Sequence, residues 1–234
     1  MQINQKGGLM DLPAKSGIPD LIGRAVLVAI FGAFAAVKGM AIANFVRAPK
    51  IDVLELATHI ANLAFLLLVV FLVTVRLKPA RGIQSWEAWV SALLGSALPL
   101  LLLALPQSAS VTGLRVAGLI MIAVGWLMSV YVVSYLGRSF SVTPQARRLV
   151  TAGPYRVVRH PLYVAEEVAV VGVMLLYLSW AAVTVVVVHW LIQLRRMANE
   201  EQVLAANFPE YQAYSENTPR VIPRLAWSGA ARTR

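Results

Sequence analysis

The chain contains no cysteine among its 234 residues. This absence excludes disulfide bonds, thiolate metal sites and cysteine nucleophiles. Charged residues are also scarce, at 14% of the chain, whereas 59% of the residues are hydrophobic and the mean hydropathy is +0.69. These values lie far outside the range of a soluble domain of this length. The composition therefore predicts a protein that crosses a membrane several times.

Acidic residues are few, with 11 Asp and Glu against 21 Lys and Arg, which gives a formal net charge of +10. The basic residues are scattered between apolar runs rather than gathered on one polar face, so we expect no nucleic-acid partner. Residues 1–20 are polar and lack an apolar core, and we expect no cleavable signal peptide there.

Four apolar stretches are long enough to cross a bilayer as helices: residues 21–46, 53–75, 86–105 and 114–136. A fifth run, residues 162–194, is too long for one ordinary crossing and is interrupted near Tyr177, Ser179 and Trp180. We therefore predict an all-α transmembrane bundle of about six spans, with the last two as a helical hairpin. A short cytoplasmic helix and a tail follow. One long tilted helix over 162–194 is the alternative.

The positive charges predict the orientation of this bundle. With six spans, only Arg47, Lys50 and Arg115 fall on the side opposite the N-terminus, and Lys38 lies inside the first span near its end, where it could snorkel. Because cytoplasmic loops carry the excess of Lys and Arg, both termini are expected in the cytoplasm. We expect a multi-pass protein of the bacterial inner membrane.

A polar cluster stands at the foot of the fifth span. It combines Tyr155, Arg156, Arg159, His160 and Tyr163 within nine residues. Pro161 suits the first position of a helix. The backbone amides that follow it are then free at the helix start and face the loop. Together with Arg156 and Arg159 they attract an anion. The cluster is therefore a candidate site for a ligand carboxylate or phosphate, although arginines and tyrosines at this depth also serve as topology anchors.

Two adjacent carboxylates, Glu200 and Glu201, follow Arg196 at the cytoplasmic end of the last span. Neighbouring residues on a helix diverge by about 100 degrees, so the two are expected to serve different partners, one a ligand and the other an arginine of the loop. The alternative is a solvated helix turn in which a glutamate pairs with Arg196.

Glu166 and Glu167 lie inside an apolar span, where a carboxylate is a functional candidate. Tyr163 and Glu167 share a helix face, and either glutamate could act as a general base or recognise a substrate amine or hydroxyl. We take Glu166, Glu167 and Arg196 as the catalytic candidates.

Six segments together resemble the isoprenylcysteine carboxyl methyltransferase and phospholipid methyltransferase superfamily. In chain order they are LGRSF (136–140), LVTAGPY (149–155), RHPLY (159–163), EExxL (200–204), FPxYxxY (208–214) and TPRVIP (218–223).

The resemblance implies an integral membrane enzyme that binds S-adenosyl-L-methionine on the cytoplasmic side and methylates a lipophilic acceptor arriving from the bilayer. It implies a cofactor site built largely from the motif RHPLY and the acidic pair at 200–201. Tyr155 is added as a further candidate, so the cofactor-binding candidates are Tyr155, Arg159, His160, Pro161, Leu162, Tyr163, Glu200 and Glu201. Residues 1–112 would form three peripheral transmembrane helices, 113–223 the methyltransferase core and 224–234 a polar tail. No metal is required and no metal-ligand spacing is present.

The acceptor stays open between a phospholipid amine, a prenylated cysteine carboxylate, a small thiol and a phenol. Ala165 and Glu166 replace the glycine and hydrophobic residue common in eukaryotic carboxyl methyltransferases, which argues against prenylcysteine. Two other functions compete. One is an NADPH-dependent membrane sterol-type reductase, which the paired glutamates disfavour because they would repel phosphates. The other is a non-enzymatic carrier that uses Glu166 and Glu167 as a relay.

Overall fold

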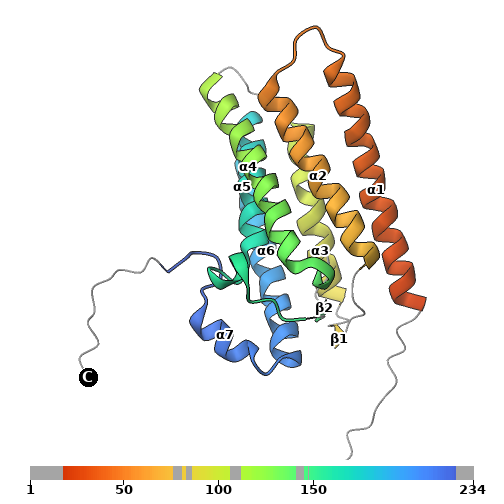
Figure 1. Cartoon of the computed structure of the whole chain (residues 1–234). Helices are drawn as coiled ribbons and strands as arrows, with labels where there is room; N and C mark the ends of the chain where they lie inside the picture. The colour runs from red at the N-terminus through yellow and green to blue at the C-terminus, as the bar shows by residue number, and fades with distance from the viewer. Residues whose placement is uncertain are drawn as a thin grey trace, which may run out of the picture.

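The computed structural model describes residues 18–75, 81–82, 86–105, 112–140, 145–146 and 148–224. The predicted polar stretch up to residue 17 and the tail from residue 225 onward lie outside these ranges. The described chain is all-helical apart from one pairing of two residues on each side, so the predicted helical bundle is confirmed (Figure 1).

The elements follow one another in short succession. In chain order they are α1 (Ile18–Val46), α2 (Val53–Val75), β1 (Arg81–Gly82), α3 (Trp86–Ala97), the 3₁₀ helix η1 (Leu98–Ala104), α4 (Thr112–Leu136), η2 (Gly137–Ser139), β2 (Gln145–Ala146), η3 (Gly153–Arg156), α5 (Pro161–Leu176), α6 (Trp180–Asn207) and α7 (Tyr211–Asn217). β1 and β2 pair antiparallel.

Four of these helices are long and apolar enough to cross a membrane: they cover Arg24–Val46, Val53–Val75, Thr112–Ser139 and Trp180–Asn207. The third predicted span is divided, because Pro99 lacks an amide proton and its ring clashes with the preceding turn, so α3 ends at Ala97 and η1 continues the chain. The long run of 162–194 is also divided. Ser179 is extended and accepts a hydrogen bond from the Ala182 amide, which begins α6.

The exact count of six spans and the membrane hairpin stay predictions. Helix α5 has 16 residues, which is short for a complete crossing. It is nevertheless in contact with both α4 and α6.

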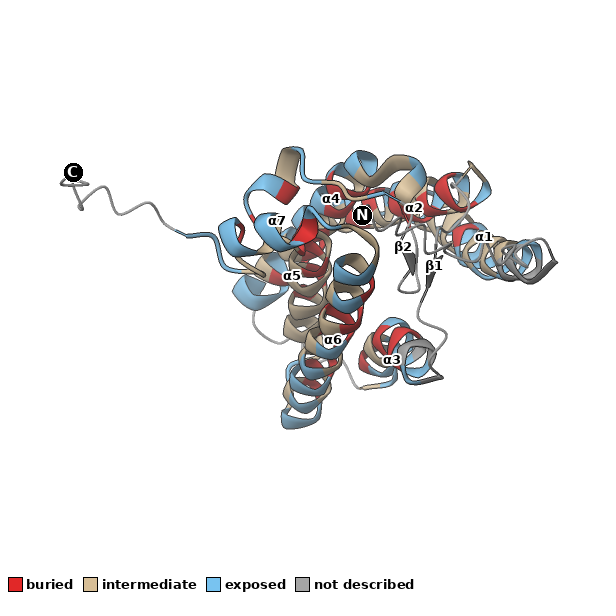
Figure 2. Ribbon diagram, turned by 90° about the horizontal axis from the view of Figure 1, so that it is seen from below, coloured by how far each residue is buried: buried red, intermediate tan, exposed pale blue. Residues whose placement is uncertain are grey.

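Helices that pack side by side follow the order α1, α2, α4, α5, α6 and α3. Viewed along the bundle, they form an arc in which α3 stands across from α1 and α2 (Figure 2). Among the described residues, α3 packs on α6 and η1 and shows no extensive packing against α1 or α2.

Helices α4 and α5 approach each other most closely through glycine. A side-chain carbon on Gly125 would lie 2.6 Å from the Ala169 amide nitrogen, so this crossing admits no larger residue. On the other flank of α4, Phe65, Val69 and Val73 of α2 form a buried cluster with Val133. This crossing places the part of α5 that precedes Ala165 against the lower half of α4.

Candidate functional site

Glu201 joins the end of α6 to the loop before α5. Its carboxylate lies 2.9 Å from His160 Nε2 and 3.2 Å from the Arg159 guanidinium, and it accepts a hydrogen bond of 3.0 Å from Arg220 Nε. The Glu201 side chain is only 14% exposed. The hydrogen bond between Arg220 and Glu201 holds the pKa of Arg220 above its usual value. The loop cluster and the acidic pair, 41 residues apart in sequence, therefore meet in one place.

Glu200 points elsewhere. It accepts a hydrogen bond from the Tyr163 hydroxyl, lies 3.8 Å from His160 Nδ1 and lines the central cavity with a side chain that is 28% exposed. No ion pair or hydrogen bond between Glu200 and Arg196 is present in the described chain. The alternative of a solvated helix turn in which these two residues pair is therefore not seen. The two carboxylates serve different partners, as their helical spacing predicts.

Arg159 retains unused binding capacity. One of its terminal nitrogens reaches both Glu201 and the Tyr211 hydroxyl, the latter at 3.4 Å. Its Nε atom is buried and has no hydrogen-bond partner among the described residues. A buried donor without a partner costs free energy, so this atom marks a place where a ligand acceptor would be stabilised.

Residues 214–220, at and after α7, form hydrogen bonds with the loop of residues 155–160 that precedes α5. The backbone amides of Arg159 and His160 donate to the carbonyl oxygens of Pro219 and Arg220, at 2.8 and 3.0 Å. The Tyr214 hydroxyl donates to the Tyr155 carbonyl at 2.7 Å. Burial raises the pKa of Tyr214 to about 12, so this phenol is protonated and able to donate at neutral pH.

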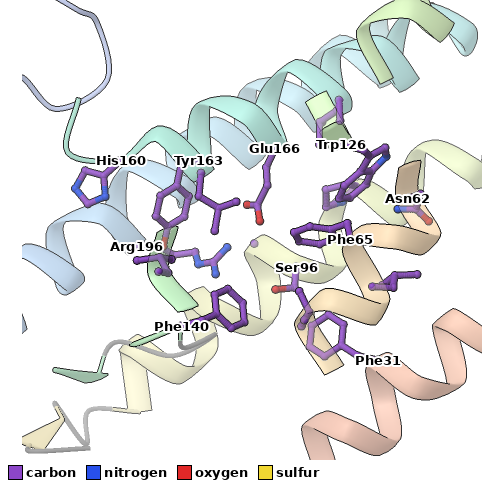
Figure 3. A pocket seen from close by; sticks show the side chains of 18 of the residues that line it. Phe31, Asn62, Phe65, Ser96, Trp126, Phe140, His160, Tyr163, Glu166 and Arg196 are labelled. Atoms are coloured by element: carbon purple, nitrogen blue, oxygen red, sulfur yellow. The ribbon is translucent and has the colours of Figure 1, made fainter. Parts of the chain in front are cut away.

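A cavity of about 920 Å³ begins at this cluster and runs into the bundle (Figure 3). Its polar end is formed by Tyr155, Arg159, His160, Tyr163 and Glu200. The lining along α4 extends from Leu119 to Leu136, about 25 Å of helix. One continuous space therefore connects the polar cluster with the apolar interior.

Glu166 stands part of the way along this space. Figure 3 shows its carboxylate directed into the cavity between Tyr163 and the aromatic rings of Phe65 and Trp126. It receives a hydrogen bond from Gln193 at 3.4 Å. No described residue forms an ion pair with it, and Oε2 carries the one hydrogen bond, so Oε1 is available to a ligand.

Arg196 crosses the cavity wall from α6. Its guanidinium carbon lies 5.1 Å from the centre of the Tyr163 ring, and its Nη1 donates to Gln193 at 2.8 Å. Gly95 of α3 makes room for it, because a side-chain carbon there would lie 2.8 Å from Arg196 Cδ. Arg196 is thus a buried cation between Tyr163 and the cavity.

Glu167 turns away from the cavity. Its carboxylate lies 2.9 Å from His189 Nδ1, while His189 Nε2 is 3.0 Å from the Gly95 carbonyl oxygen. Because a carbonyl only accepts, His189 donates to Gly95 through Nε2, and the contact of Nδ1 with Glu167 holds one further proton, on the ring or on the carboxyl group. This chain of contacts links α5, α6 and α3 and gives Glu167 a packing partner.

Most of the residues expected from the sequence meet at the cavity, but some do not line it. Leu162, Glu166 and Arg196 line it with the polar-end residues above; Pro161, Glu167 and Glu201 do not. Arg156 is exposed. Two residues of the site are not among those expected from the sequence. Arg220, the partner of Glu201, lies within the segment TPRVIP, and Gln193 lies in no motif.

Residues 114–211 match the family described as phospholipid methyltransferase. The match confirms the resemblance to the superfamily of integral membrane methyltransferases. It covers α4 to the start of α7 and leaves α1, α2 and α3 outside.

Two curated bacterial proteins are similar to part of the chain. A nickel-cobalt-cadmium resistance protein, NccN, of Alcaligenes xylosoxydans xylosoxydans is 34% identical over 83 residues, which are 35% of this chain and 39% of that protein. A cobalt-zinc-cadmium resistance protein, CzcN, of Cupriavidus metallidurans is 35% identical over 79 residues, 33% of this chain and 37% of that protein. The chain thus spans less than two fifths of the length of these relatives.

Proposed function

We propose that this chain is an integral membrane methyltransferase that transfers a methyl group from S-adenosyl-L-methionine to a lipophilic acceptor reaching it from the bilayer. The observation that carries the proposal is the single cavity that connects the polar cluster at His160 and Glu200 with the apolar bundle interior. The family match over residues 114–211 supports a membrane methyltransferase.

The polar end of the cavity fits the charged ends of the cofactor. The unpartnered Nε of Arg159 and the nearby His160 would hold the methionyl carboxylate. Glu200, which has one hydrogen-bond donor among the described residues, would hold the ammonium or the ribose hydroxyls. Glu201 is already bound by Arg159, His160 and Arg220, so it would position these side chains rather than touch the ligand.

When bound, the cofactor supplies an electrophilic methyl group on a sulfonium: the acceptor's lone pair forms the new bond to carbon, and the electron pair of the broken carbon–sulfur bond stays on sulfur. The protein has to align the two partners and exclude water. Glu166, the carboxylate directed into the cavity, would take the proton that the acceptor loses. Arg196, which is linked to Glu166 through the Gln193 side chain, would orient the acceptor.

A side opening would admit the acceptor. Phe34 and Val37 of α1 and Leu100 of η1 all line the cavity, yet they are 47%, 60% and 49% exposed. Because α3 does not pack extensively on α1 or α2 in the described chain, these apolar residues form the rim of a gap that faces lipid. We propose that the acceptor enters there, between α1 and η1.

The orientation in the membrane is part of the same proposal. The end of α1 at Ile18, η3 and α7 lie at one end of the bundle (Figure 1). We propose that this end faces the cytoplasm, that the helices complete six crossings, and that the protein resides in a bacterial inner membrane. In the part of the chain that the structure describes, no group of three or more His, Asp or Glu side chains that could hold a metal ion is found.

The test is equilibrium binding of S-adenosylhomocysteine to the purified protein in lipid nanodiscs, measured by titration calorimetry. We expect saturable binding by the wild type. Glu200→Gln should weaken it at least about 10-fold, because a hydrogen bond to a charged group contributes roughly 1.5–3 kcal/mol. Reduced nicotinamide dinucleotide phosphate should not bind.

Glu216→Gln is the matched control, because Glu216 lies in α7 and is exposed, so its affinity should equal that of the wild type. Folded wild-type protein that binds the nicotinamide dinucleotide but not S-adenosylhomocysteine would overturn the proposal in favour of a reductase.

A further inference from the structure

The cavity has a second polar region, far from His160 and Glu200. It is formed by Lys38 of α1 and by Glu55, Thr58, His59 and Asn62 of α2, all of which line the same space. These residues lie outside the segment 114–211 that matches the methyltransferase family. The shared cofactor-binding core therefore does not account for them.

Lys38 is turned toward His59 rather than toward the end of its helix. Its ammonium nitrogen lies 3.4 Å from His59 Nδ1, and the edge of the Phe45 ring packs against the imidazole with centroids 5.7 Å apart. The snorkelling expected from the sequence does not describe this geometry. An ammonium can only donate, so His59 Nδ1 accepts and Nε2 carries the ring proton of the neutral imidazole.

This arrangement leaves several donors free. Lys38 has one hydrogen-bond partner among the described residues, which leaves two N–H groups, and His59 adds its Nε2–H. The Asn62 amide has no hydrogen-bond partner in the described chain, and Figure 3 shows it at the cavity wall beyond Trp126. Thr58 is already engaged with the Glu55 carbonyl at 2.7 Å.

The nearby carboxylates are engaged by another cation. Arg115 of α4 lies 3.0 Å from both Asp52 and Glu55. Asp52 also accepts hydrogen bonds from the Leu54 and Glu55 amides and so caps α2. Lys38 thus contacts a neutral imidazole and, among the described residues, no carboxylate. Charged side chains inside a membrane span usually pair with one another or with backbone carbonyls, or face a water-filled cavity. Lys38 lines this cavity and has only His59 as a hydrogen-bond partner among the described residues, so an anionic ligand in the cavity would pair with it.

The distance from this region to Glu166 sets the size of such a ligand. Arg115 and Glu55 fix the register of α4 against α2, which places His59 near the level of Leu119. Gly125 contacts Ala165 and Ala169, which places Glu166 near the level of Trp126. Seven residues of helix separate these levels, or about 10 Å along the bundle. Phe65 and Trp126, with ring centroids 4.9 Å apart, line the cavity at the Glu166 end of this interval, and Ile122 lines it between the two levels.

We propose that Lys38, His59 and Asn62 bind the anionic end of the methyl acceptor, and that the acceptor is an amphipathic acid. Its carboxylate or phosphate would lie about 10 Å from the atom that receives the methyl group, with an apolar body between them. This inference rests on the proposed function, because it identifies the class of acceptor for the same site. The three donors outside the cofactor core then select acids over neutral lipids of the same length.

The probe that tests it is 11-(dansylamino)undecanoic acid, with its methyl ester as the uncharged counterpart. Binding to the full-length protein in zwitterionic nanodiscs is followed by dansyl fluorescence. The wild type should bind the acid at least about 10-fold more tightly than the ester, as expected for one charge-assisted contact. Lys38→Met should remove this preference while leaving ester affinity unchanged, and Lys38→Arg should retain it.

Lys50→Met is the matched control, since Lys50 is exposed in the turn between α1 and α2, and it should retain the acid preference. Displacement of the probe by oleate or by oleoyl lysophosphatidate distinguishes a carboxylate from a phosphate source; either supports the site. Displacement by monooleoylglycerol as effective as by both acids would overturn it.

S-adenosylhomocysteine binding is measured on the same samples. If the Lys38→Met variant binds S-adenosylhomocysteine as the wild type does, the variant is folded. If this folded variant still prefers the acid over the ester, the inference is wrong. If the wild type prefers the acid, Lys38→Met removes this preference, and the wild type binds no S-adenosylhomocysteine, the anion site is supported and the proposed methyl transfer is refuted.

Discussion

Replacing the two adjacent carboxylates one at a time should separate stability from ligand binding. Glu201→Gln removes the charge that Arg159, His160 and Arg220 share, and the side chains of Glu201 and Arg159 are only 14% and 17% exposed. Removing one partner of a buried ion pair costs about 3–5 kcal/mol, and we expect about 3 because Arg220 is 39% exposed and remains solvated.

For a chain of this length, about 3 kcal/mol corresponds to a midpoint of thermal unfolding lowered by roughly 6–12 °C. Glu200→Gln removes a single bond from the Tyr163 hydroxyl and should lower stability by only about 1 kcal/mol. The Glu200 variant should instead lose ligand affinity while keeping its fold.

The assay is thermal unfolding in nanodiscs followed by tryptophan fluorescence, combined with titration of S-adenosylhomocysteine. Glu216→Gln serves as the control for a lost surface carboxylate. The assignment is refuted if Glu200→Gln destabilises the protein as much as Glu201→Gln, or if Glu201→Gln unfolds at the wild-type temperature.

Three further perturbations address the contact between α4 and α5, the hydrogen bond from Tyr214 to the Tyr155 carbonyl, and catalysis. Gly125→Ala should destabilise the protein by about 1–3 kcal/mol because its new carbon meets the α5 backbone, whereas Gly32→Ala, which meets nothing within 4 Å, should be neutral or slightly stabilising; equal unfolding temperatures would contradict the α4–α5 contact. Tyr214→Phe removes the hydrogen bond to the Tyr155 carbonyl and should cost about 1 kcal/mol in chemical unfolding, a loss that would be absent if the bond does not form. Glu166→Gln should slow methyl transfer about 100-fold or more with S-adenosylhomocysteine affinity unchanged, and an undiminished rate would exclude Glu166 as the base.

Much of this architecture could be predicted from the apolar runs. The predicted span over residues 53–75 coincides with α2, and the end of the run at Leu136 coincides with the end of α4. The third apolar run is predicted as one span from its length. Pro99 within it indicates the division into α3 and η1, since proline interrupts a helix. The break near Ser179 is predicted from this serine and the interface aromatics Tyr177 and Trp180, and its physical cause is the cap that Ser179 provides to α6.

The site could be predicted in part. Residue type and order brought His160 and Glu201 into one hypothesis, and the structure places them in contact. Sequence could not decide which of Glu166 and Glu167 faces the cavity, because adjacent helical residues differ only by rotation about the axis. The contact of Lys38 with His59 joins two helices, and no spacing within either one reveals it.

The most direct test of the central claim is photo-crosslinking with radiolabelled 8-azido-S-adenosylmethionine, followed by mass spectrometry of the labelled peptides. The account predicts labelling within residues 155–163 or 196–214, abolished by excess S-adenosylhomocysteine and strongly reduced in Glu200→Gln. Labelling confined to α1 and α2, or labelling that excess S-adenosylhomocysteine does not reduce, would contradict a cofactor site between the start of α5 and the end of α6.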